Sequence, residues 1–338
     1  MAETSTDLAS LIRKEAARLG FAATGFSSLT QESLALQRFT AMIQEKRHGE
    51  MIYMEKWMEE RANPSLLLSG LHTIISVAIS YNYTLASREG LPKISKYGLI
   101  NDYHTVVRGK LEKLLAAIKI LAGEPLRGLI TVDSSPLLEK NWAEKAGIGK
   151  TGKNTLLQVP SAGSNIVLGE ILLDRAIPSS KFTLPNVCGS CSKCLDHCPT
   201  GALIEPRKID ASKCISYLTV ELKREFTTEE AAMIGDWMFG CDLCQEVCPS
   251  NQQAGIMADP AFELRNELVN ISTEKILSLT RSGFRELFYG TPVFRIGLRR
   301  LKRNALAVAE NLKRCDFQDK SKLGSHLPPN LQGKRGYY

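Results

Sequence analysis

Eight of the nine cysteines in this 338-residue chain fall between residues 188 and 248, and their spacing constrains the fold more than any other feature. The first run, residues 188 to 199, follows the pattern C-x2-C-x2-C-x3-C-P. A second set begins at Cys214 and, after 26 intervening residues, continues as C-x2-C-x3-C-P at residues 241 to 249. Disulfide frameworks are typical of small secreted chains, whereas this chain is long and confines its cysteines to one stretch. The spacing therefore favours metal ligation over disulfides.

The two runs match the cysteine pattern of bacterial ferredoxins that carry two 4Fe-4S clusters. In that pattern three thiolates of one run hold three corners of a cubane, and the fourth reaches the second cluster. The predicted ligand sets are Cys188, Cys191, Cys194 and Cys248 for one cluster, and Cys198, Cys214, Cys241 and Cys244 for the other. Structural zinc is the alternative for paired C-x2-C, but zinc explains neither the third cysteine at this spacing nor the Cys-Pro endings. The remaining Cys315 is most simply a free thiol.

The length of chain outside the cysteine runs indicates more than an electron carrier. Roughly 180 residues precede the clusters and about 90 follow them. A pure electron-transfer protein would have no evident use for these segments, although that class remains the alternative. We therefore expect an enzyme whose own redox centre accepts electrons from the clusters.

The net charge of +7 is unevenly distributed along the chain. Residues 291 to 338 contain eleven Lys or Arg and three acidic residues, so this segment carries +8 and the first 290 residues carry −1. Concentrated positive charge attracts polyanions such as nucleic acid, although a solvated helix face explains the charge equally well. The N-terminus lacks the layout of a secretory signal, and the most apolar stretch, residues 73 to 80, is too short to span a bilayer. We expect a cytoplasmic protein without membrane contact.

The part ahead of the cysteines alternates helical and strand patterns, which predicts an α/β fold with a mixed sheet. Apolar spacing of three and four residues indicates helices, and short β-branched apolar runs indicate strands. Helices are expected over residues 7–19, 34–48 and 102–122 and from Ser135 to Ala146, and strands over residues 21–26, 71–83, 127–133 and 164–174.

Residues 147 to 155, GIGKTGKNT, fit G-x-G-x-x-G and nearly fit a phosphate loop, in which Asn154 stands where a Ser or Thr is required. Both nucleotide-binding patterns need a preceding strand and a following helix. Here a helix capped by Ser135 precedes the stretch, and Gly147 is expected to end that helix in a left-handed conformation. The order of elements disfavours a nucleotide site and leaves a loop that could wrap another ligand.

Asp133 is the last residue of a predicted strand and is followed directly by a predicted helix. Catalytic side chains gather at the carboxyl ends of strands in α/β folds, but an aspartate at this place can equally cap the helix. Tyr103 and His104 present the same choice, because each could be a donor in a pocket or merely a residue at a helix start.

At this point the chain resembles the epoxyqueuosine reductase family, over roughly residues 5 to 312. The resemblance rests on long strings: NDYH at 101 to 104, VDSSPLLEKNWAEKAGIGKTGKNTLL at 132 to 157, CGSCSKCLDHCPTGAL at 188 to 203, CISYLTVELK at 214 to 223 and FGCDLCQEVCPSN at 239 to 251. The cysteine runs alone are shared with many ferredoxin-like proteins, whereas the combination is much narrower.

The resemblance implies reduction of epoxyqueuosine to queuosine at the wobble position of tRNA, with cobalamin as the second cofactor beside the two clusters. It further implies that Asp133, the aspartate of the V-D-[ST]-x-P string, is the general acid that protonates the departing oxygen. The stretch GIGKTGKNT would then line the corrin pocket. The residues expected to contact the cofactor are Asp133, Tyr103, His104, Lys153, Asn154, Leu157, Ser216 and Tyr217.

The basic C-terminal segment contains one apolar helix stripe, from Phe294 to Leu312, with its cations mainly off that stripe. Such a helix packs against the body and presents positive charge outward, which suits tRNA phosphates. It resembles the family's HEAT-like helical repeats, although only about one repeat precedes the Gly- and Pro-containing residues 322 to 338. The residues expected to contact tRNA are Lys223, Arg295, Arg299, Arg300 and Arg303.

These features predict three parts: an α/β cobalamin-binding catalytic domain (1–180), a ferredoxin-like domain with a helical insertion (181–252) and a helical, basic tRNA-contacting region (253–338). An external low-potential electron donor is expected, and the absence of coiled-coil patterns suggests a monomer. A reductive dehalogenase-like enzyme acting on a small molecule is the alternative that shares both cofactors.

Overall fold

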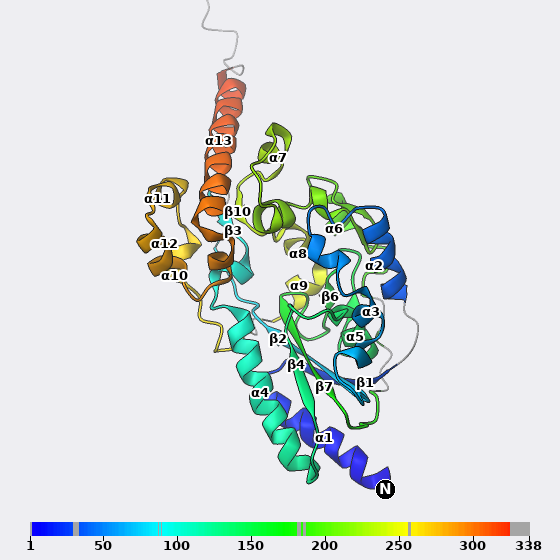
Figure 1. Ribbon diagram of the computed structural model, residues 1–338. Coiled ribbons are helices and arrows are strands. Elements are labelled where there is room, and N and C mark those ends of the chain that lie inside the picture. Colours follow the sequence, from blue (N-terminus) through cyan, green and yellow to red (C-terminus); the bar gives the residue numbers. More distant parts are fainter. Residues whose placement is uncertain are drawn as a thin grey trace, which may run out of the picture.

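A four-stranded sheet forms the centre of the N-terminal part (Figure 1). The computed structural model describes residues 2–29, 34–86, 88, 90–180, 184, 187–255 and 258–324. The sheet order is β1 (Ala23–Ser28), β2 (Thr73–Ser80), β7 (Ile166–Leu173) and β4 (Gly128–Thr131). Every neighbouring pair in it is antiparallel. The α/β class is confirmed, whereas the central sheet is antiparallel throughout and not mixed. The parallel pair of β3 (Lys93–Ile94) and β10 (Trp237–Phe239) forms a separate small sheet.

The central strand β2 is buried on both faces, as its continuous apolar sequence requires. Ile75 and Val77 point into the core shared with α1 (Ala2–Arg18) and α4 (Tyr103–Ala122). Ile74 points to the other face, where it meets Trp142 of α5 (Glu139–Lys145). Because side chains alternate along a strand, one apolar run provides core residues to the helices on both faces of the sheet.

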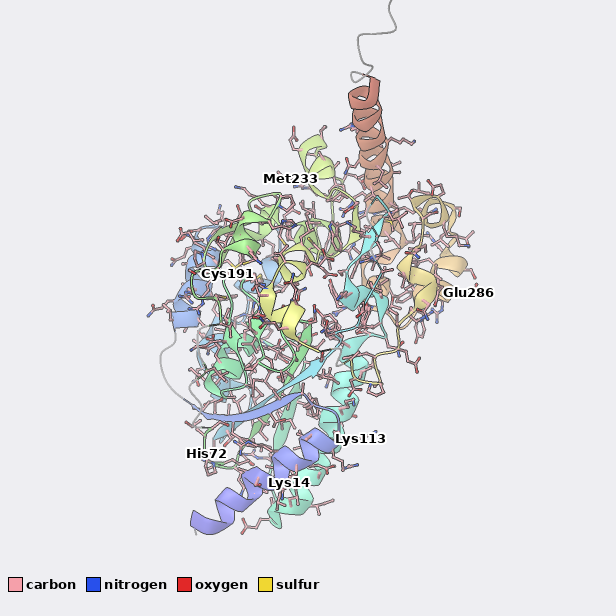
Figure 2. The ribbon with its side chains drawn as sticks, turned by 180° about the vertical axis from the view of Figure 1, so that it is seen from behind. Lys14, His72, Lys113, Cys191, Met233 and Glu286 are labelled. Atoms are coloured by element: carbon pink, nitrogen blue, oxygen red, sulfur yellow. The ribbon has the colours of Figure 1, made fainter. Side chains whose placement is uncertain are left out.

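The cysteine region, residues 187–251, lies beside this sheet and consists of short elements. They are α6 (Lys193–Asp196), β8 (Leu203–Glu205), β9 (Lys208–Ile209), η4 (Ala211–Lys213), the π-helix η5 (Tyr217–Glu221), α7 (Thr228–Met233), β10, α8 (Leu243–Glu246) and α9 (Pro249–Gln253). Helices α6 and α8, which hold Cys194 of the first cysteine run and Cys244 of the second, contact each other. Figure 2 places Cys191 on the opposite side of the body from Lys14 and Lys113 of α1 and α4. The insertion between Cys214 and Cys241 holds helices, as predicted, and also strand β10.

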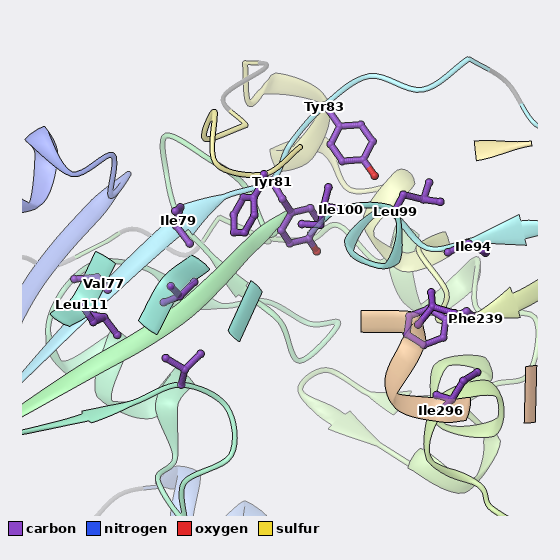
Figure 3. Packing of buried hydrophobic residues seen from close by; sticks show 14 of the residues in the cluster. Val77, Ile79, Tyr81, Tyr83, Ile94, Leu99, Ile100, Leu111, Phe239 and Ile296 are labelled. Carbon is purple, nitrogen blue, oxygen red and sulfur yellow. The ribbon is translucent and has the colours of Figure 1, made fainter. Parts of the chain in front are cut away.

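The C-terminal part packs short helices against the long helix α13 (Gly297–Gly324), which projects from the body in Figure 1. The short helices are α10 (Asn266–Val269), α11 (Thr273–Ser278), α12 (Arg281–Phe288) and η6 (Pro292–Ile296). Figure 3 shows the core continuing from Val77 and Leu111 of the sheet layer through Leu99 to Phe239 and Ile296. One apolar core therefore joins the three parts.

The remaining elements cover the sheet and connect its strands. They are α2 (Leu34–Gln44), η1 (Ile52–Glu55), α3 (Met58–Ala62), η2 (Pro64–Leu66), η3 (Lys96–Leu99), β5 (Lys150–Thr151) and β6 (Leu157–Gln158). None of the helices described has the length and apolar character needed to cross a membrane.

One helix boundary differs from the sequence prediction. Helix α5 begins at Glu139 after Leu138, and no side chain caps it, so the expected cap by Ser135 is wrong. The Ser135 carbonyl instead accepts a hydrogen bond from Leu137 N at 2.7 Å, which makes a turn before the helix. The prediction for Gly147 is confirmed, since its φ is 75° just after α5. Residues 325 to 338 and the Cys315 side chain lie outside the described residues.

Candidate active site

The thiols of the cysteine region influence one another in two groups. Burial, and then the neighbouring thiols of Cys188 and Cys248, raise the pKa of the Cys194 thiol. Burial also raises the pKa of Cys214, with Cys198 as its neighbouring thiol. Each of these pairs lies within one of the two ligand sets expected from the sequence. Thiols held in their neutral form by burial become good ligands once a cation offsets the charge of the thiolate.

Burial is again the largest cause raising the pKa values of Cys241 and Cys244. The thiols that act on both include Cys214, which belongs to the same expected set. Cys244 is also influenced by Cys194 of the other set, so the two groups are near neighbours. Two redox centres held this close can exchange electrons directly.

The loop of residues 147 to 155 lies on the first cysteine run. The Lys153 backbone N–H donates to Cys188 Sγ at 3.4 Å, and Lys153 Nζ donates to the Cys191 carbonyl at 2.8 Å. The glycines of the loop serve its own folding, because a Cβ on Gly149 would lie 2.8 Å from the Gln158 carbonyl. A glycine is therefore required at position 149 by packing inside the protein.

Asn154 holds a buried polar group without a partner in this loop. Its Oδ1 accepts from Leu156 N at 3.2 Å and from Gln158 Nε2 at 3.4 Å. Its Nδ2 is buried and has no hydrogen-bond partner among the described residues. Leu157 beside it is buried in a small apolar cluster. An unmatched buried donor is costly, so an acceptor supplied by a bound group would stabilise this position.

A second group of side chains, termed here the Asp133 corner, gathers where β4 ends. Its members are Asp102, Tyr103, His104, Asp133, Glu139 and Arg295. The Tyr103 hydroxyl donates to Asp133 Oδ2 at 2.8 Å, and His104 Nε2 lies 3.2 Å from the same oxygen. Half of the Asp133 side chain, 53%, is exposed, so its carboxyl is supported on one side and open on the other.

The first turn of α4 orients His104. Asp102 caps the helix by accepting from the His104 backbone N–H at 3.0 Å, and the same Oδ1 lies 2.8 Å from His104 Nδ1. The ring of His104 also stacks on Tyr103, with centroids 4.1 Å apart. The sequence left open whether Tyr103 and His104 begin a helix or act as donors to another group. In the structure they do both, since they begin α4 and also contact Asp133.

The charges of the Asp133 corner favour an ion pair between His104 and its two carboxylates, with Arg295 included in the balance. Burial and the charge of Arg295 lower the pKa of His104, but the hydrogen bonds that Asp102 and Asp133 accept from its ring outweigh both and raise this pKa overall. The hydrogen bond from His104 is the largest influence that lowers the pKa of Asp133, with Tyr103 also contributing. Burial raises the pKa of Tyr103, so its phenol stays protonated as a donor.

Two glutamates lie near Asp133, and sequence reasoning missed both. Glu139 Oε1 accepts from the Asp133 backbone N–H at 2.6 Å, and burial raises the pKa of Glu139 to about 8. The Asp133 backbone has φ 56°, a left-handed conformation that costs energy in most residues. Glu170 of β7 is fully buried, accepts from Thr131 Oγ1 at 3.1 Å, and has its pKa raised by burial. The sequence feature that could have identified Glu170 is its position as the only acidic residue in the apolar run of residues 166 to 173.

Arg295, one of the residues expected to contact tRNA, lies against His104. Its Nη1 is 2.6 Å from His104 Nε2 and 3.1 Å from Nδ1. The residue belongs to η6, which precedes α13, and its side chain is exposed. The fold thus brings a cation from the C-terminal region to the end of β4.

Other residues of the basic segment divide into buried and exposed ones. Arg303 is 9% exposed, donates to the carbonyls of Leu218 and Leu222, and lies 3.9 Å from the Phe226 ring centroid. Its guanidinium is committed to the fold, so the expected contact between Arg303 and tRNA does not fit the structure. Arg300 likewise donates to the Val220 carbonyl at 2.8 Å.

A basic pocket of about 510 Å³ opens at the start of α13. Its cations are Lys223, Arg281, Arg299 and Arg300, and Phe284 and Leu298 form part of its apolar wall. Lys223 and Arg299 are exposed, whereas Arg281 of α12 was not anticipated from the sequence. Four cations around one opening suit an anionic ligand.

The two remaining residues expected at the cofactor lie in and before η5. Tyr217 is buried, and its hydroxyl accepts from the Glu50 backbone N–H at 2.8 Å. Ser216 hydrogen-bonds the phenol of Tyr97, a partly buried side chain whose pKa is raised by burial of the phenol. Ser216 and Tyr217 thus have partners inside the fold, and neither is brought into direct contact with Asp133.

Two family models match the chain. One, described as "4Fe-4S double cluster binding domain", matches residues 187–251, and the other, "Epoxyqueuosine reductase QueG, DUF1730", matches residues 61–134. An epoxyqueuosine reductase of Cellulophaga algicola is 36% identical over 294 residues, covering 87% of this chain and 95% of that protein.

Solved structures agree with these sequence matches. An epoxyqueuosine reductase crystallised with an epoxyqueuosine-modified tRNA-Tyr stem loop has a TM-score of 0.83 and 27% identity, over 96% of this chain and 87% of that one. The Bacillus subtilis enzyme, with its catalytic aspartate loop swung out of the active site, matches with the same score, identity and coverage.

Proposed function

Because the chain belongs to the epoxyqueuosine reductase family of oxidoreductases, we propose that it reduces epoxyqueuosine to queuosine at the wobble position of tRNA. The observation that carries the proposal is the half-exposed Asp133 carboxyl, held by Tyr103 and His104 at the end of β4. A carboxyl fixed on one side and open on the other is placed to give a proton to a substrate.

The reaction removes the epoxide oxygen as water, which requires two electrons and two protons. The electrons reach the site through two 4Fe-4S clusters, in keeping with the double-cluster domain at residues 187–251. We assign Cys188, Cys191, Cys194 and Cys248 to one cluster and Cys198, Cys214, Cys241 and Cys244 to the other. The proximity of thiols within each set supports this division.

The residues around Asn154 fit a bound cobalamin. The buried, unpartnered Asn154 Nδ2 offers a donor to the amide oxygens at the corrin edge, and Leu157 supplies apolar contact. When bound, cobalamin supplies a strongly reducing, nucleophilic metal centre that receives electrons from the clusters. Lys153 ties this loop to the first cysteine run, which keeps the pocket next to the electron source.

Asp133 acts as the general acid and its neighbours keep it in place. The Tyr103 hydroxyl donates to Oδ2, which leaves Oδ1 to face the substrate. Glu139 holds the Asp133 backbone N–H and so stabilises the left-handed turn. Protonating the leaving oxygen avoids an alkoxide, which leaves poorly at neutral pH.

The basic pocket is the proposed contact for tRNA phosphates, through Lys223, Arg281 and Arg299. Such contacts position the anticodon loop without reading sequence, and an unstacked wobble base can be splayed toward Asp133. Arg303 is left out because its guanidinium is buried on backbone carbonyls. A tRNA substrate implies a cytoplasmic enzyme, for which we propose a monomer served by an external low-potential electron donor.

The test is turnover on tRNA that carries epoxyqueuosine, using protein reconstituted with iron, sulfide and cobalamin and supplied with a low-potential chemical reductant. Conversion to queuosine is expected, and Asp133→Asn should lower the rate by about 10²- to 10⁴-fold while both cofactors stay bound. Glu286→Gln removes the same charge on exposed α12, far from Asp133 in sequence, and is the matched control (Figure 2).

Three results would contradict the proposal. Turnover unchanged in Asp133→Asn would remove the acid from the mechanism. Clusters that assemble in a protein unable to bind cobalamin would indicate an electron-transfer protein. Reduction of a small organohalide in preference to the modified tRNA would indicate a dehalogenase-like enzyme.

A further inference from the structure

We infer that the exposed side chains of Tyr53 and Trp57, termed here the aromatic platform, stack against unpaired bases of the tRNA anticodon loop. Tyr53 belongs to η1, and Trp57 directly precedes α3. The inference rests on the proposed function, since it names the part of the tRNA that this segment contacts. Its basis is a tryptophan whose conformation and exposure the fold itself does not explain.

Trp57 differs from the other tryptophans of the chain in its surroundings and its backbone. It is 62% exposed, whereas Trp142 and Trp237 are 4% and 1% exposed. Its φ of 60° and ψ of 39° are left-handed, which is costly for a bulky residue. It also occupies the N-cap position of α3, where short polar side chains are preferred, and its side chain caps nothing. Strain that the fold does not repay is typical of a functional position.

Hydrogen bonds hold the segment that carries the aromatic platform in one shape. His48 is buried, and its Nε2 lies 2.9 Å from Glu55 Oε1 across the segment. The Glu50 backbone N–H donates to the Tyr217 hydroxyl at 2.8 Å, and the Glu50 carboxylate pairs with Arg224 at 2.8 Å. The two aromatic residues are therefore presented on a framework that is formed before any ligand binds, which reduces the entropy lost on binding.

Tyr53 lies at the boundary between the Asp133 corner and solvent. The residue is 54% exposed. Partial burial of its phenol is the largest cause that raises the pKa of Tyr53 to about 12, and the charges of Glu221 and Asp133 raise it further. The charge of Arg295 acts in the opposite direction. One side of Tyr53 therefore faces the Asp133 corner, while the other remains open.

Glu221 connects this boundary to the basic pocket. Burial is the largest cause that raises the pKa of Glu221, and the charge of Asp133 also raises it. Arg300 and Lys223, which line the basic pocket, lower the same pKa. The pocket, Glu221 and the Asp133 corner are thus neighbours. An RNA strand with phosphates in the pocket and its wobble base at Asp133 passes close to the aromatic platform.

The surroundings of the aromatic platform favour RNA over the other flat ligand of this enzyme, the corrin. The donor that fits the corrin is Asn154, in the loop that Lys153 ties to the first cysteine run. The cations that act on Tyr53 are Arg61 and Arg295 instead, and they suit the phosphates of a nearby strand. Every base has a π-face, so aromatic rings stack on an unpaired strand whatever its sequence.

The first test measures binding of a fluorescently labelled anticodon stem loop carrying epoxyqueuosine to holoprotein with both cofactors. Trp57→Gly removes the ring and suits the left-handed backbone, and it should weaken binding by about 10-fold or more. Trp57→Phe keeps a ring and should stay within about 3-fold. The salt dependence should not change, because no charge is lost. Ile120→Ala, which shortens an exposed apolar side chain near the far end of α4, should bind normally.

The second test asks whether the contact is made to unpaired bases. Abasic nucleotides are placed in turn at each unpaired position except the wobble position. At the stacked position the base and the ring should be non-additive, so that Trp57→Gly costs little further affinity. An RNA duplex with the sequence of the stem should bind both proteins equally, because its bases are already stacked. In turnover, KM should rise about 10-fold while kcat stays within about 3-fold.

Four outcomes would overturn the inference. Unchanged affinity of Trp57→Gly for the stem loop would exclude stacking, and an equal loss on the duplex would exclude contact with unpaired bases. Weaker cobalamin binding, with normal stem-loop affinity once the protein is loaded, would make Trp57 a corrin contact. A lower urea midpoint in Trp57→Gly would make the ring part of the fold. Failure of the proposed function would instead appear as absent turnover in the unsubstituted protein, which leaves the binding comparison intact.

Discussion

The cysteine region and the Asp133 corner are assembled from the chain in different ways. The cysteine region takes seven of its eight thiols from two short runs, each of which contains one of the contacting helices α6 and α8. The Asp133 corner draws on three segments, and the contact between His104 and Arg295 joins residues 191 apart in the sequence. In the cysteine region the spacing of residues along the chain specifies the ligands. In the Asp133 corner the protonation states depend on how distant segments pack together.

The largest effect is expected from removing a single thiol. Cys241→Ala should cost one cluster, reduce iron from about eight to about four atoms per chain, and lower turnover by more than about 100-fold. Iron and sulfide analysis, with the absorption spectrum, measures the loss. Cys315→Ala lies outside both ligand runs and should keep full iron content. A Cys241→Ala protein with both clusters intact would show that the assigned ligand set is wrong.

The next effect concerns the contact between helix α13 and the cysteine region. Arg303→Met removes the donors to the Leu218 and Leu222 carbonyls in the segment after Cys214. Buried carbonyls left without donors should lower the free energy of unfolding by about 2–4 kcal/mol, measured as a shift in the urea midpoint. Arg299→Met, one turn earlier and exposed, should change it by less than about 0.5 kcal/mol. Equal shifts in both variants would contradict the assignment of Arg303 to the fold.

A smaller effect should appear as a change in the pH dependence of stability. The pKa of Glu139 is raised to about 8 in the folded protein, so its contribution is fully present below the unfolded value near 4.5 and is lost as pH rises through about 8. The urea midpoint of the unsubstituted protein should therefore fall between pH 6 and pH 8.5. In Glu139→Gln, which keeps an acceptor for the Asp133 N–H, this slope should flatten. If the urea midpoint of Glu139→Gln depended on pH as strongly as that of the unsubstituted protein, a group other than Glu139 would be responsible for the pH dependence.

The smallest effect is expected at the basic pocket. Arg299→Met should weaken binding of the modified tRNA by several-fold and reduce the salt dependence of binding by about one counterion, because one phosphate contact is removed. Filter binding over a range of salt concentrations measures both quantities. Lys302→Met lies on the same helix outside the pocket, and an equal loss in both variants would indicate that general charge, rather than the pocket, attracts the tRNA.

The comparison also explains what could be predicted from the sequence. The α/β class, the position of Gly147 and the strands around residues 73–80 and 166–173 follow from local patterns, and these predictions are confirmed. Asp133 could be proposed as a catalytic residue because it ends a predicted strand. Glu139 was taken as an ordinary helix residue, since nothing in its neighbourhood shows that its carboxyl turns back to the Asp133 N–H.

Arginines are the clearest failure of local reasoning. The stripe from Phe294 to Leu312 predicted correctly that a helix packs with cations beside it, but it assigned Arg295, Arg299 and Arg303 to one surface. The structure gives them three different environments: a histidine ring, an open pocket and a set of buried carbonyls. Which one an arginine meets is decided by elements far away in the sequence, so no window along the chain contains the information.

The left-handed turn at position 133 restricts which amino acids natural selection can place there. With φ at 56°, Asp and Asn fit with little penalty, whereas a longer acid such as Glu meets greater steric cost and carries its carboxyl farther from the backbone. Lineages that vary this site are therefore confined to a short acid, its amide or glycine. Of these only the acid can deliver a proton, so the geometry of one dihedral angle narrows the evolutionary alternatives almost to a single residue.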